Sequence, residues 1–191
     1  MLRRILVLTS LLVVACAQIA PVAVQPPPLK DAQAIVLDID GTLTPHDALV
    51  FVARPGAAKA VSAFASKGYE IIYISVRVPM FQAGLKDWLR VNGFPTGVLH
   101  VAQTAEERAS PEIFKAALID AYSRSGWRIA YAYGDSSTDF AAYAKARIPQ
   151  ERVYALKRLL SSDCQVGRYH LCLDNWNEHF EFVQRDVSRA K

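Results

Sequence analysis

The sequence lacks any apolar run that is long enough to cross a bilayer as a stable helix. Its N-terminal run, Ile5 to Val14, follows the basic start Met1-Leu2-Arg3-Arg4, and a spanning helix needs about 20 apolar residues. The sequence also lacks a strong charge of either sign, since 22 Lys and Arg residues face 18 Asp and Glu residues and leave a net charge of +4. This balance gives no basic footprint for nucleic acid. We find no internal repeat and no second domain boundary, and 191 residues suit one domain with a sizeable core.

Cysteine is scarce, with three residues in the chain, and the first of them follows the apolar run. The segment Val13-Val14-Ala15-Cys16 looks like a bacterial lipoprotein signal, in which small residues precede a Cys that is lipidated and becomes the new N-terminus. An ordinary secretory signal with an incidental Cys is the alternative. Cleavage would leave 191 − 15 = 176 residues and, by removing Arg3 and Arg4, lower the net charge to 4 − 2 = +2. The anchor predicts an exported protein attached to a bacterial membrane on its periplasmic or cell-surface side.

The other two cysteines, Cys164 and Cys172, predict a disulfide, which is the default pairing in an exported protein. His170 and His179 lie nearby and leave zinc as an alternative, although their spacing matches no familiar zinc pattern. Residues 17–30 contain four prolines and no apolar periodicity, which predicts an extended tether. We therefore divide the chain into a signal peptide (1–15), a Pro-rich tether (16–30) and one domain (31–191).

The most informative stretch runs from Ala34 to Thr44, where an apolar run leads into two carboxylates. Such a run predicts a strand that is covered on both faces, as in a parallel sheet. Because side chains two residues apart share a face, we expect Asp38 and Asp40 to project together where the strand ends, with the Thr42 hydroxyl beside them. Adjacent buried carboxylates are tolerable mainly when a cation joins them. An Asp-Gly hairpin turn at Gly41 is the alternative.

A second apolar run, residues 71–77, predicts another buried strand and ends near a hydroxyl and a base. Ser75 either binds a substrate oxygen or caps the helix that follows. Arg77 has the planar fork that pairs with an anion. Beyond it, residues 79–91 have the periodicity of one amphipathic helix, and residues 98–101 predict a short strand.

A third group of polar residues follows residue 110. Ser110-Pro111 predicts a helix start with Ser110 as N-cap, and places Lys115 in the first two turns, where the helix dipole disfavours a cation. A solvated surface Lys is the alternative. The strand 129–133 then leads into Gly-Asp-three residues-Asp, with acids at Asp135 and Asp139; a strand-to-helix turn capped by Thr138 or Asp139 is the alternative. Hard oxygen ligands with room for water and phosphate favour Mg²⁺ over Zn²⁺.

These stretches, in this order, resemble the four signatures of the haloacid dehalogenase (HAD) superfamily of phosphohydrolases. The resemblance implies that Asp38 is the nucleophile and Asp40 the general acid/base. It also implies that Ser75 and Lys115 stabilise the transferred phosphoryl group. The full implied site comprises catalytic Asp38, Asp40, Ser75 and Lys115, substrate-binding Thr42 and Arg77, and Mg²⁺ ligands Asp38, Asp40, Asp135 and Asp139.

A closer resemblance covers most of residues 31–157. The stretches 111–115, 131–134, 139–143, 148–149 and 152–153 are similar to the catalytic domain of lipin-type phosphatidate phosphatases. That family usually has Gly-Asn-Arg where this chain has Gly134-Asp135-Ser136. Asp135 restores the common HAD form, and the missing Arg bears on substrate choice. The lipin N-terminal domain has no counterpart in this sequence.

The implied fold is a three-layer α/β sandwich with a mostly parallel, Rossmann-like HAD sheet. A final strand is expected at 153–156 and a closing helix around Trp176 to Val183. The intervals from Thr44 to Ile71 and from Ser75 to Lys115 are too short for a large cap domain, so we expect an open site.

The expected function is Mg-dependent hydrolysis of a phosphomonoester through an aspartyl-phosphate. An open site beside a membrane suits a lipid phosphate or another bulky ester. Two alternatives remain: a general exported acid phosphatase acting on nucleotides or small esters, and a non-catalytic lipoprotein that binds lipid or phosphate.

Overall fold

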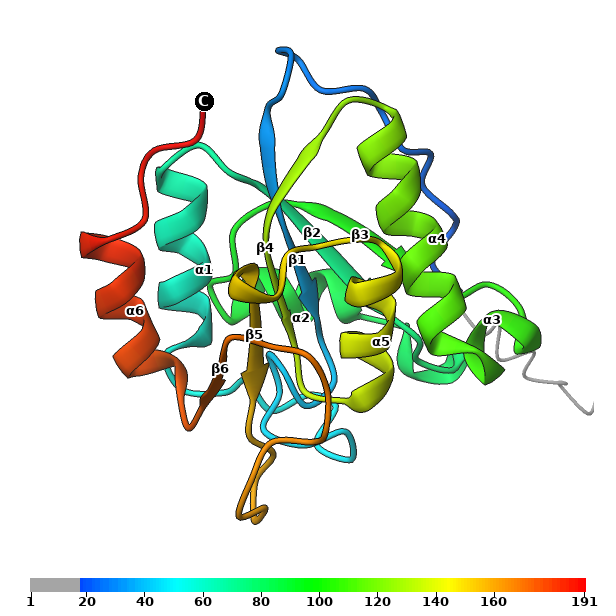
Figure 1. Ribbon diagram of the computed structural model, residues 1–191. Coiled ribbons are helices and arrows are strands. Elements are labelled where there is room, and N and C mark those ends of the chain that lie inside the picture. Colours follow the sequence, from blue (N-terminus) through cyan, green and yellow to red (C-terminus); the bar gives the residue numbers. More distant parts are fainter. Residues whose placement is uncertain (1–17) are drawn as a thin grey trace, which may run out of the picture.

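The computed structural model describes residues 18–191, so the predicted signal peptide and Cys16 lie outside the described residues. Residues 18–191 form a three-layer α/β sandwich around a six-stranded sheet (Figure 1). The strands run in the order β3-β2-β1-β4-β5-β6 and every neighbouring pair is parallel. The strands are β1 (Gln33–Asp38), β2 (Glu70–Ser75), β3 (Val98–Val101), β4 (Arg128–Gly134), β5 (Val153–Leu156) and β6 (Leu171–Leu173). The predicted fold class is confirmed.

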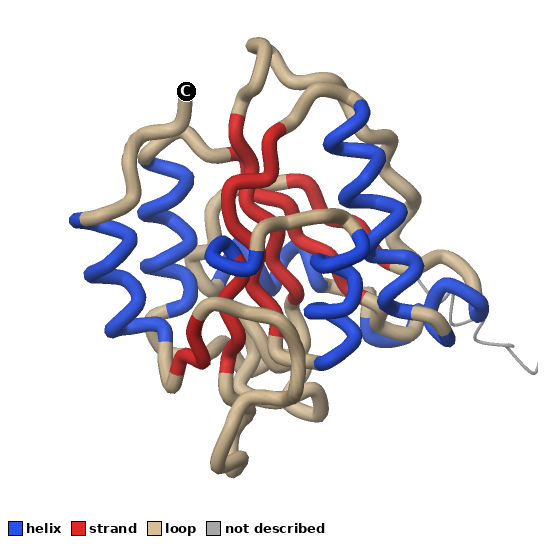
Figure 2. The backbone as a smooth tube through the Cα atoms, in the orientation of Figure 1, coloured by secondary structure: helices blue, strands red, loops and turns tan. Residues whose placement is uncertain are grey.

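Helices cover both faces of the sheet, as the blue and red tubes of Figure 2 show. They are α1 (Ala57–Ser66), α2 (Leu85–Val91), α3 (Ala105–Ala109), α4 (Pro111–Arg124), α5 (Ser137–Lys145) and α6 (Trp176–Arg185), with short 3-10 helices η1 (Pro79–Phe81) and η2 (Gln150–Arg152). One core lies between the sheet and α1, α2 and α6, and the other lies between the sheet and α4 and α5.

The central strand β1 explains why its sequence is apolar without alternation. Ile35 and Leu37 point into the first core, whereas Ala34 and Val36 point into the second, and all four are fully buried. Each residue therefore packs against a helical layer, which is the requirement of a parallel sheet covered on both faces.

The carboxyl ends of all six parallel strands point to one edge of the sheet, which we call the site edge. Chain order along the sheet reverses at β1, because β2 lies on one side of it and β4 on the other. In parallel sheets of this kind, ligands bind beyond the carboxyl ends of the strands at such a switch point. The loops that leave the site edge include residues 39–56, 76–84 and 157–170, and the last of these crosses to the opposite edge, where His170 N donates to the Val153 carbonyl.

Three local features differ from the expectations. The expected single helix over residues 79–91 is broken into η1 and α2, because Gly84 between them adopts a left-handed conformation (φ +74°). Ser110 precedes α4, as predicted, but its side chain makes no capping hydrogen bond. An additional helix, α3, begins at Thr104 in a reciprocal capping box with Glu107.

The last strand and helix close the sheet. The strand β6 was not predicted, because it has three residues and is largely exposed. Cys172 in this strand forms a disulfide with Cys164 in the loop before it. Helix α6 packs beside α1 with Trp176 and Val183 buried, and it contains His179, whose Nε2 pairs with the Tyr133 hydroxyl at 2.8 Å. His179 is thus a core residue, and the zinc alternative has no support in this part of the chain.

Residues 18–27 form neither helix nor strand, residues 28–31 form a turn before β1, and the segment packs along the domain; we call residues 18–32 the strap. At the site edge, Gln18 Nε2 donates to the Gln103 carbonyl (3.0 Å), and Ile19 N donates to Gln82 Oε1 (3.2 Å). The strap then runs beside α4 to the opposite edge (Figure 1), where the Trp127 indole donates to the Gln25 carbonyl.

The described residues, 18–191, contain six strands, six α-helices and both cores. Within this part of the chain, no helix has the length and hydropathy that crossing a bilayer requires.

Candidate active site

Four buried charged side chains meet beyond the carboxyl ends of β1 and β4. Lys115 Nζ lies 2.5 Å from Asp38 Oδ1 and 2.5 Å from Asp139 Oδ1. Oxygen atoms of Asp38, Asp135 and Asp139 all lie within 4.8 Å of one another. Each of these four residues is less than 5% exposed. Three segments that are distant in the sequence therefore form one buried polar centre.

The fold positions each member of this centre by simple rules. Asp38 lies two residues after Val36 and so faces the same layer, which contains α4 and α5. Lys115 projects from the second turn of α4 and is buried between two carboxylates, so it is not a surface residue. Asp139 lies in the first turn of α5, directly after β4.

Asp139 is also part of a helix cap. Its Oδ2 accepts hydrogen bonds from the backbone N–H groups of Asp135 (3.2 Å) and Ser136 (3.1 Å), while the Ser136 hydroxyl serves as the N-cap of α5. The alternative that Thr138 or Asp139 is the N-cap is therefore wrong, because the N-cap is Ser136 and Asp139 is the third residue of the helix in a reciprocal capping box. One oxygen fixes the helix start, and the other faces Lys115.

Two glycines allow the acidic loops to approach each other. At Gly41, φ is +88° and a Cβ atom would lie 2.0 Å from Asp135 Oδ2. At Gly134, a Cβ atom would lie 2.6 Å from the Asp139 Cβ. A side chain at either position would push the carboxylates apart, and at Gly41 the backbone conformation also favours glycine.

Asp40 forms a second polar group with Ser75 and Arg77. The Asp40 carboxylate accepts two close contacts from Arg77 Nε (2.7 and 2.9 Å) and one hydrogen bond from the Ser75 hydroxyl (3.0 Å). Because β1 ends at Asp38, the alternation of side chains does not extend to Asp40, which lies in the following turn. The predicted substrate-binding Arg77 is buried, and its Nη1 atom has no hydrogen-bond partner.

Thr42 links the two acidic loops. Its hydroxyl donates to Asp38 Oδ2 at 3.0 Å and lies 3.5 Å from Asp135 Oδ1. The Thr42 carbonyl in turn accepts a hydrogen bond from the indole of Trp176 (3.0 Å). The loop after β1 is therefore fixed by the closing helix as well as by its own turn.

Two arginines of the site were missed by sequence reasoning. Arg158 forms an ion pair with Asp135 through its Nε and a second, at 3.2 Å, with Asp47 through Nη1. Arg54 is buried and donates to the carbonyls of Gly41 (2.6 Å) and Lys157 (2.8 Å), so it joins the loops after β1 and β5. Neither arginine belongs to a recognisable motif, and only the tertiary structure brings them to the site.

Burial dominates the electrostatics of the centre. It raises the pKa of Asp38 well above its ordinary value; Lys115 counteracts this shift, while the carboxylates of Asp139 and Asp135 add to it. Burial also raises the pKa of Asp135, to about 6, and Asp139 adds to the shift. For Lys115, burial disfavours the charge, but its two carboxylate partners outweigh burial and raise the pKa of the ammonium, which stays protonated. One ammonium cannot neutralise three carboxylates.

The residues of this centre fit a divalent cation. Three carboxylates face one ammonium and one guanidinium, which leaves one uncompensated negative charge in a buried site. Hard oxygen donors around such a charge are the ligand type that Mg²⁺ prefers. Of the four acids that the sequence predicts as Mg²⁺ ligands, the structure brings the carboxylates of Asp38, Asp135 and Asp139 together in a group that could hold a metal ion. The carboxylate of Asp40 is directed to Arg77.

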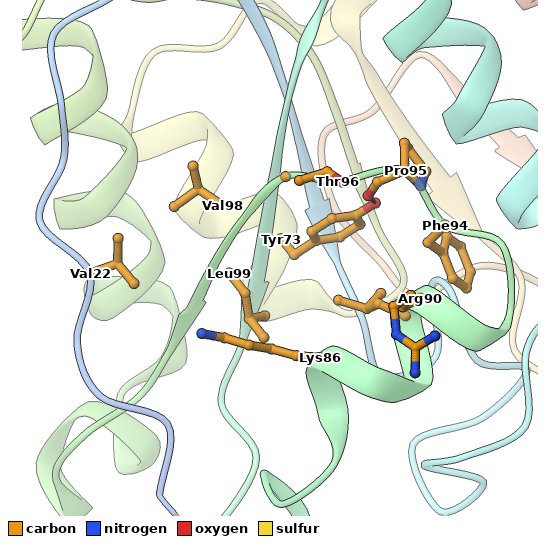
Figure 3. A pocket seen from close by; sticks show the side chains of 11 residues that line it. Val22, Tyr73, Lys86, Arg90, Phe94, Pro95, Thr96, Val98 and Leu99 are labelled. Atoms are coloured by element: carbon orange, nitrogen blue, oxygen red, sulfur yellow. Dashed lines mark hydrogen bonds between the residues drawn. The ribbon is translucent and has the colours of Figure 1, made fainter.

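A separate pocket lies between the strap, α2 and β3 (Figure 3). Lys86 and Arg90 from α2 and Tyr73 from β2 line it, and the Tyr73 hydroxyl donates to the Pro95 carbonyl. It contains none of the residues of the acidic centre, and we assign it no part in the chemistry.

Comparisons with known proteins agree with this fold and site. The structure resembles D,D-heptose 1,7-bisphosphate phosphatase from B. bronchiseptica, solved with magnesium and phosphate, at a TM-score of 0.58 and 16% identity, over 81% of this chain and 99% of that one. It also resembles a chain of the Pnkp1/Rnl/Hen1 RNA repair complex, at a TM-score of 0.56 and 14% identity, over 78% of this chain but only 48% of that one. No curated protein matches the sequence.

The fold and the acidic centre together define a phosphatase of the HAD type. More narrowly, residues 35–157 match the model of a family described as "PITM 1-3, LNS2 domain", and the chain belongs to this LNS2 family. The matched range contains every residue of the acidic centre and ends just before Arg158.

Proposed function

We propose that this chain hydrolyses phosphomonoesters in two steps through a phosphorylated Asp38, and that its substrate is a lipid phosphate. The observation that carries the proposal is the position of Asp38, which lies at the end of the central strand with Lys115 at 2.5 Å. A carboxylate next to a fixed cation can attack phosphorus while the cation offsets the charge that develops.

In the first step, an oxygen of Asp38 attacks phosphorus in line, the bond from phosphorus to the leaving oxygen breaks, and Asp40 donates a proton to that oxygen. In the second step, Asp40 removes a proton from water, the water oxygen attacks phosphorus, and the Asp38 carboxylate is released with inorganic phosphate. Ser75 and Arg77 orient Asp40 for both transfers through the contacts described above. Lys115 stays protonated throughout and keeps its place beside Asp38.

The metal would be held by Asp38, Asp135 and Asp139, together with the Asp40 carbonyl. Bound Mg²⁺ supplies the positive charge that offsets the charge of the transferred phosphoryl group. Thr42 keeps Asp38 in place through its hydrogen bond to Oδ2.

The lipid substrate is supported by the lack of a cap domain over the site edge within residues 18–191. The chain passes from β1 to α1 through residues 39–56 and from β2 to α2 through residues 76–84, and neither connection contains a cap domain. A substrate that is itself part of a large surface can reach such a site. We also propose that Cys16 carries a lipid that attaches the exported protein to a bacterial membrane; the Cys164–Cys172 disulfide is in keeping with an oxidising compartment. Labelling cells with a radioactive fatty acid tests the anchor, because label should enter the chain and Cys16→Ala should abolish it.

The test of function is phosphate release from phosphatidate, phosphatidylglycerophosphate, nucleotides and p-nitrophenyl phosphate, with and without EDTA. We expect release from the lipid phosphates, loss of release with EDTA, and a fall of several orders of magnitude in Asp38→Asn. Asp87→Asn is the matched control, because Asp87 is an exposed acid on α2 that pairs only with Arg90. Release from nucleotides alone would exclude the lipid substrate. Full turnover in Asp38→Asn would exclude the covalent step, and no release from any ester would leave a binding function.

A further inference from the structure

Exposed apolar side chains are concentrated at the site edge. Of the fourteen large apolar residues that are exposed among residues 18–191, nine lie in three loops that follow β1, β2 and β5. They are Leu49, Phe51 and Val52 after β1, Val78, Met80 and Phe81 after β2, and Leu159, Leu160 and Val166 after β5. We call these nine residues the apolar rim. Figure 1 shows the loops after β1 and β5 at the same end of the molecule, beyond the strand ends.

Contacts with the rest of the domain fix the loops that carry the apolar rim, so the rim side chains are exposed in a defined conformation. The guanidinium of Arg77 lies over the Phe51 ring at 5.5 Å, and the Phe51 carbonyl accepts a hydrogen bond from Trp88. The loop after β5 is held to the sheet by the Cys164–Cys172 disulfide and presents Leu160, which is 98% exposed, at its tip. Isolated exposed apolar residues are ordinary, but a group of them at one edge of a domain marks an interaction surface.

The position at which the strap begins supports a membrane as the surface that the apolar rim faces. Gln18, the first described residue, is hydrogen-bonded to Gln103 directly after β3, and Ile19 is bonded to Gln82 in the loop after β2. The described chain therefore begins at the site edge and not at the opposite one. Residue 16 is at most about 7 Å of extended chain from residue 18.

We propose that the apolar rim inserts into the surface of a lipid bilayer and holds the acidic centre at the level of the lipid phosphates. This inference deepens the proposed function, because it names the surface through which that site would receive a lipid substrate. Residue 18, which lies two positions after the proposed anchor, is at the same edge of the domain as the rim. The anchor and the rim can therefore engage one membrane at once. The alternatives to a bilayer are a protein partner or a second copy of the chain bound to the same rim.

The binding test uses residues 18–191, which contain both cores and lack Cys16, after circular dichroism and cooperative urea unfolding have established that this segment folds. The protein is sedimented with vesicles of phosphatidylcholine containing phosphatidate. The triple variant Met80→Gln/Leu160→Gln/Val166→Asn changes three rim residues that are at least 66% exposed, so packing is not disturbed. The control is Leu29→Gln/Val91→Asn, because these residues are 67% and 66% exposed but lie at the opposite edge.

We expect the rim variant to bind vesicles at least tenfold more weakly than the control, because each apolar side chain that enters hydrocarbon strengthens binding about tenfold or more. Turnover of p-nitrophenyl phosphate, which needs no bilayer, should be equal in both variants, whereas turnover of vesicle phosphatidate should fall in the rim variant. Equal vesicle binding by the two variants would overturn the proposal, as would a dimer that the rim variant disrupts while vesicle binding persists.

A second measurement reports how deeply the apolar rim enters the bilayer. Residues 18–191 contain only the disulfide cysteines, so Met80→Cys or Val91→Cys provides a single thiol for a fluorophore. Brominated lipids should quench the label at position 80 and leave the label at position 91 unchanged; equal quenching would overturn the proposal. Neither binding measurement requires turnover, so an inactive protein would refute the proposed function and leave the docking surface to be judged separately.

Discussion

Replacement of Lys115 by Met tests the acidic centre most directly, because it removes one charge while nearly preserving the volume of the side chain. The ammonium lies 2.5 Å from both Asp38 and Asp139 in a region closed to solvent. Without it, three carboxylates remain within 4.8 Å of one another. At an effective dielectric constant of about 20, two unit charges at that separation repel by about 3.5 kcal/mol.

We therefore expect Lys115→Met to lower the free energy of unfolding by about 3–5 kcal/mol in the absence of divalent cations, the cost of breaking a buried ion pair. Excess Mg²⁺ should recover much of this loss, because a bound cation replaces the missing positive charge and stabilises the folded state by mass action. The same cation should stabilise the wild-type protein by less.

The assay is urea unfolding followed by circular dichroism, in EDTA and in excess Mg²⁺, for the wild type, Lys115→Met and Lys145→Met. Lys145 is an exposed lysine at the end of α5 and serves as the control for a lost positive charge. An equal effect of both substitutions would refute the electrostatic reasoning. A loss of stability in Lys115→Met that Mg²⁺ does not reduce would refute the metal site.

Three further predictions follow from other parts of the site and core. Arg77→Gln removes the guanidinium that orients Asp40, so kcat should fall at least tenfold with a smaller change in KM; unchanged kcat would show that Arg77 does not position the acid. Burial lowers the pKa of His179 from 6.5 to about 4, so the unfolded state takes up a proton between these values that the folded state does not. Stability should therefore fall as the pH falls, by about 2 kcal/mol near pH 5, and in a urea titration across pH His179→Gln should flatten this dependence; an unchanged slope would contradict it. Gly41→Ala should lower both the thermal midpoint and turnover, because its Cβ would lie 2.0 Å from Asp135 Oδ2; retention of both would contradict the close approach.

The parts of the fold that the sequence predicts are those with a strong periodic signal. The strands β1, β2 and β4 are continuous apolar runs because both of their faces are buried, and such runs have few other interpretations. The strand β6 has three residues and no buried side chain, so it had no periodicity to detect. The break at Gly84 was missed because the apolar spacing of residues 79–91 continues across it.

The residues of the candidate site likewise separate into those that a sequence pattern predicts and those that it does not. Asp38, Lys115 and Asp139 were found because each stands at a fixed place relative to a strand or helix end. Arg54 and Arg158 were missed because their partners are mostly backbone carbonyls and distant acids, which leave no pattern in neighbouring residues. The direction of Asp40 was also missed, since a turn obeys no two-residue alternation.

The strap has a practical consequence for attaching other proteins. Gln18 lies at the site edge, whereas the C-terminal segment packs at the opposite edge, where Ala190 N donates to the Lys67 carbonyl (Figure 1). A reporter fused after Lys191 would therefore stand away from the site edge and leave it unobstructed. The same reporter fused before Gln18 would crowd the site edge. Fusion geometry alone should thus decide whether a tagged protein retains its access to large substrates.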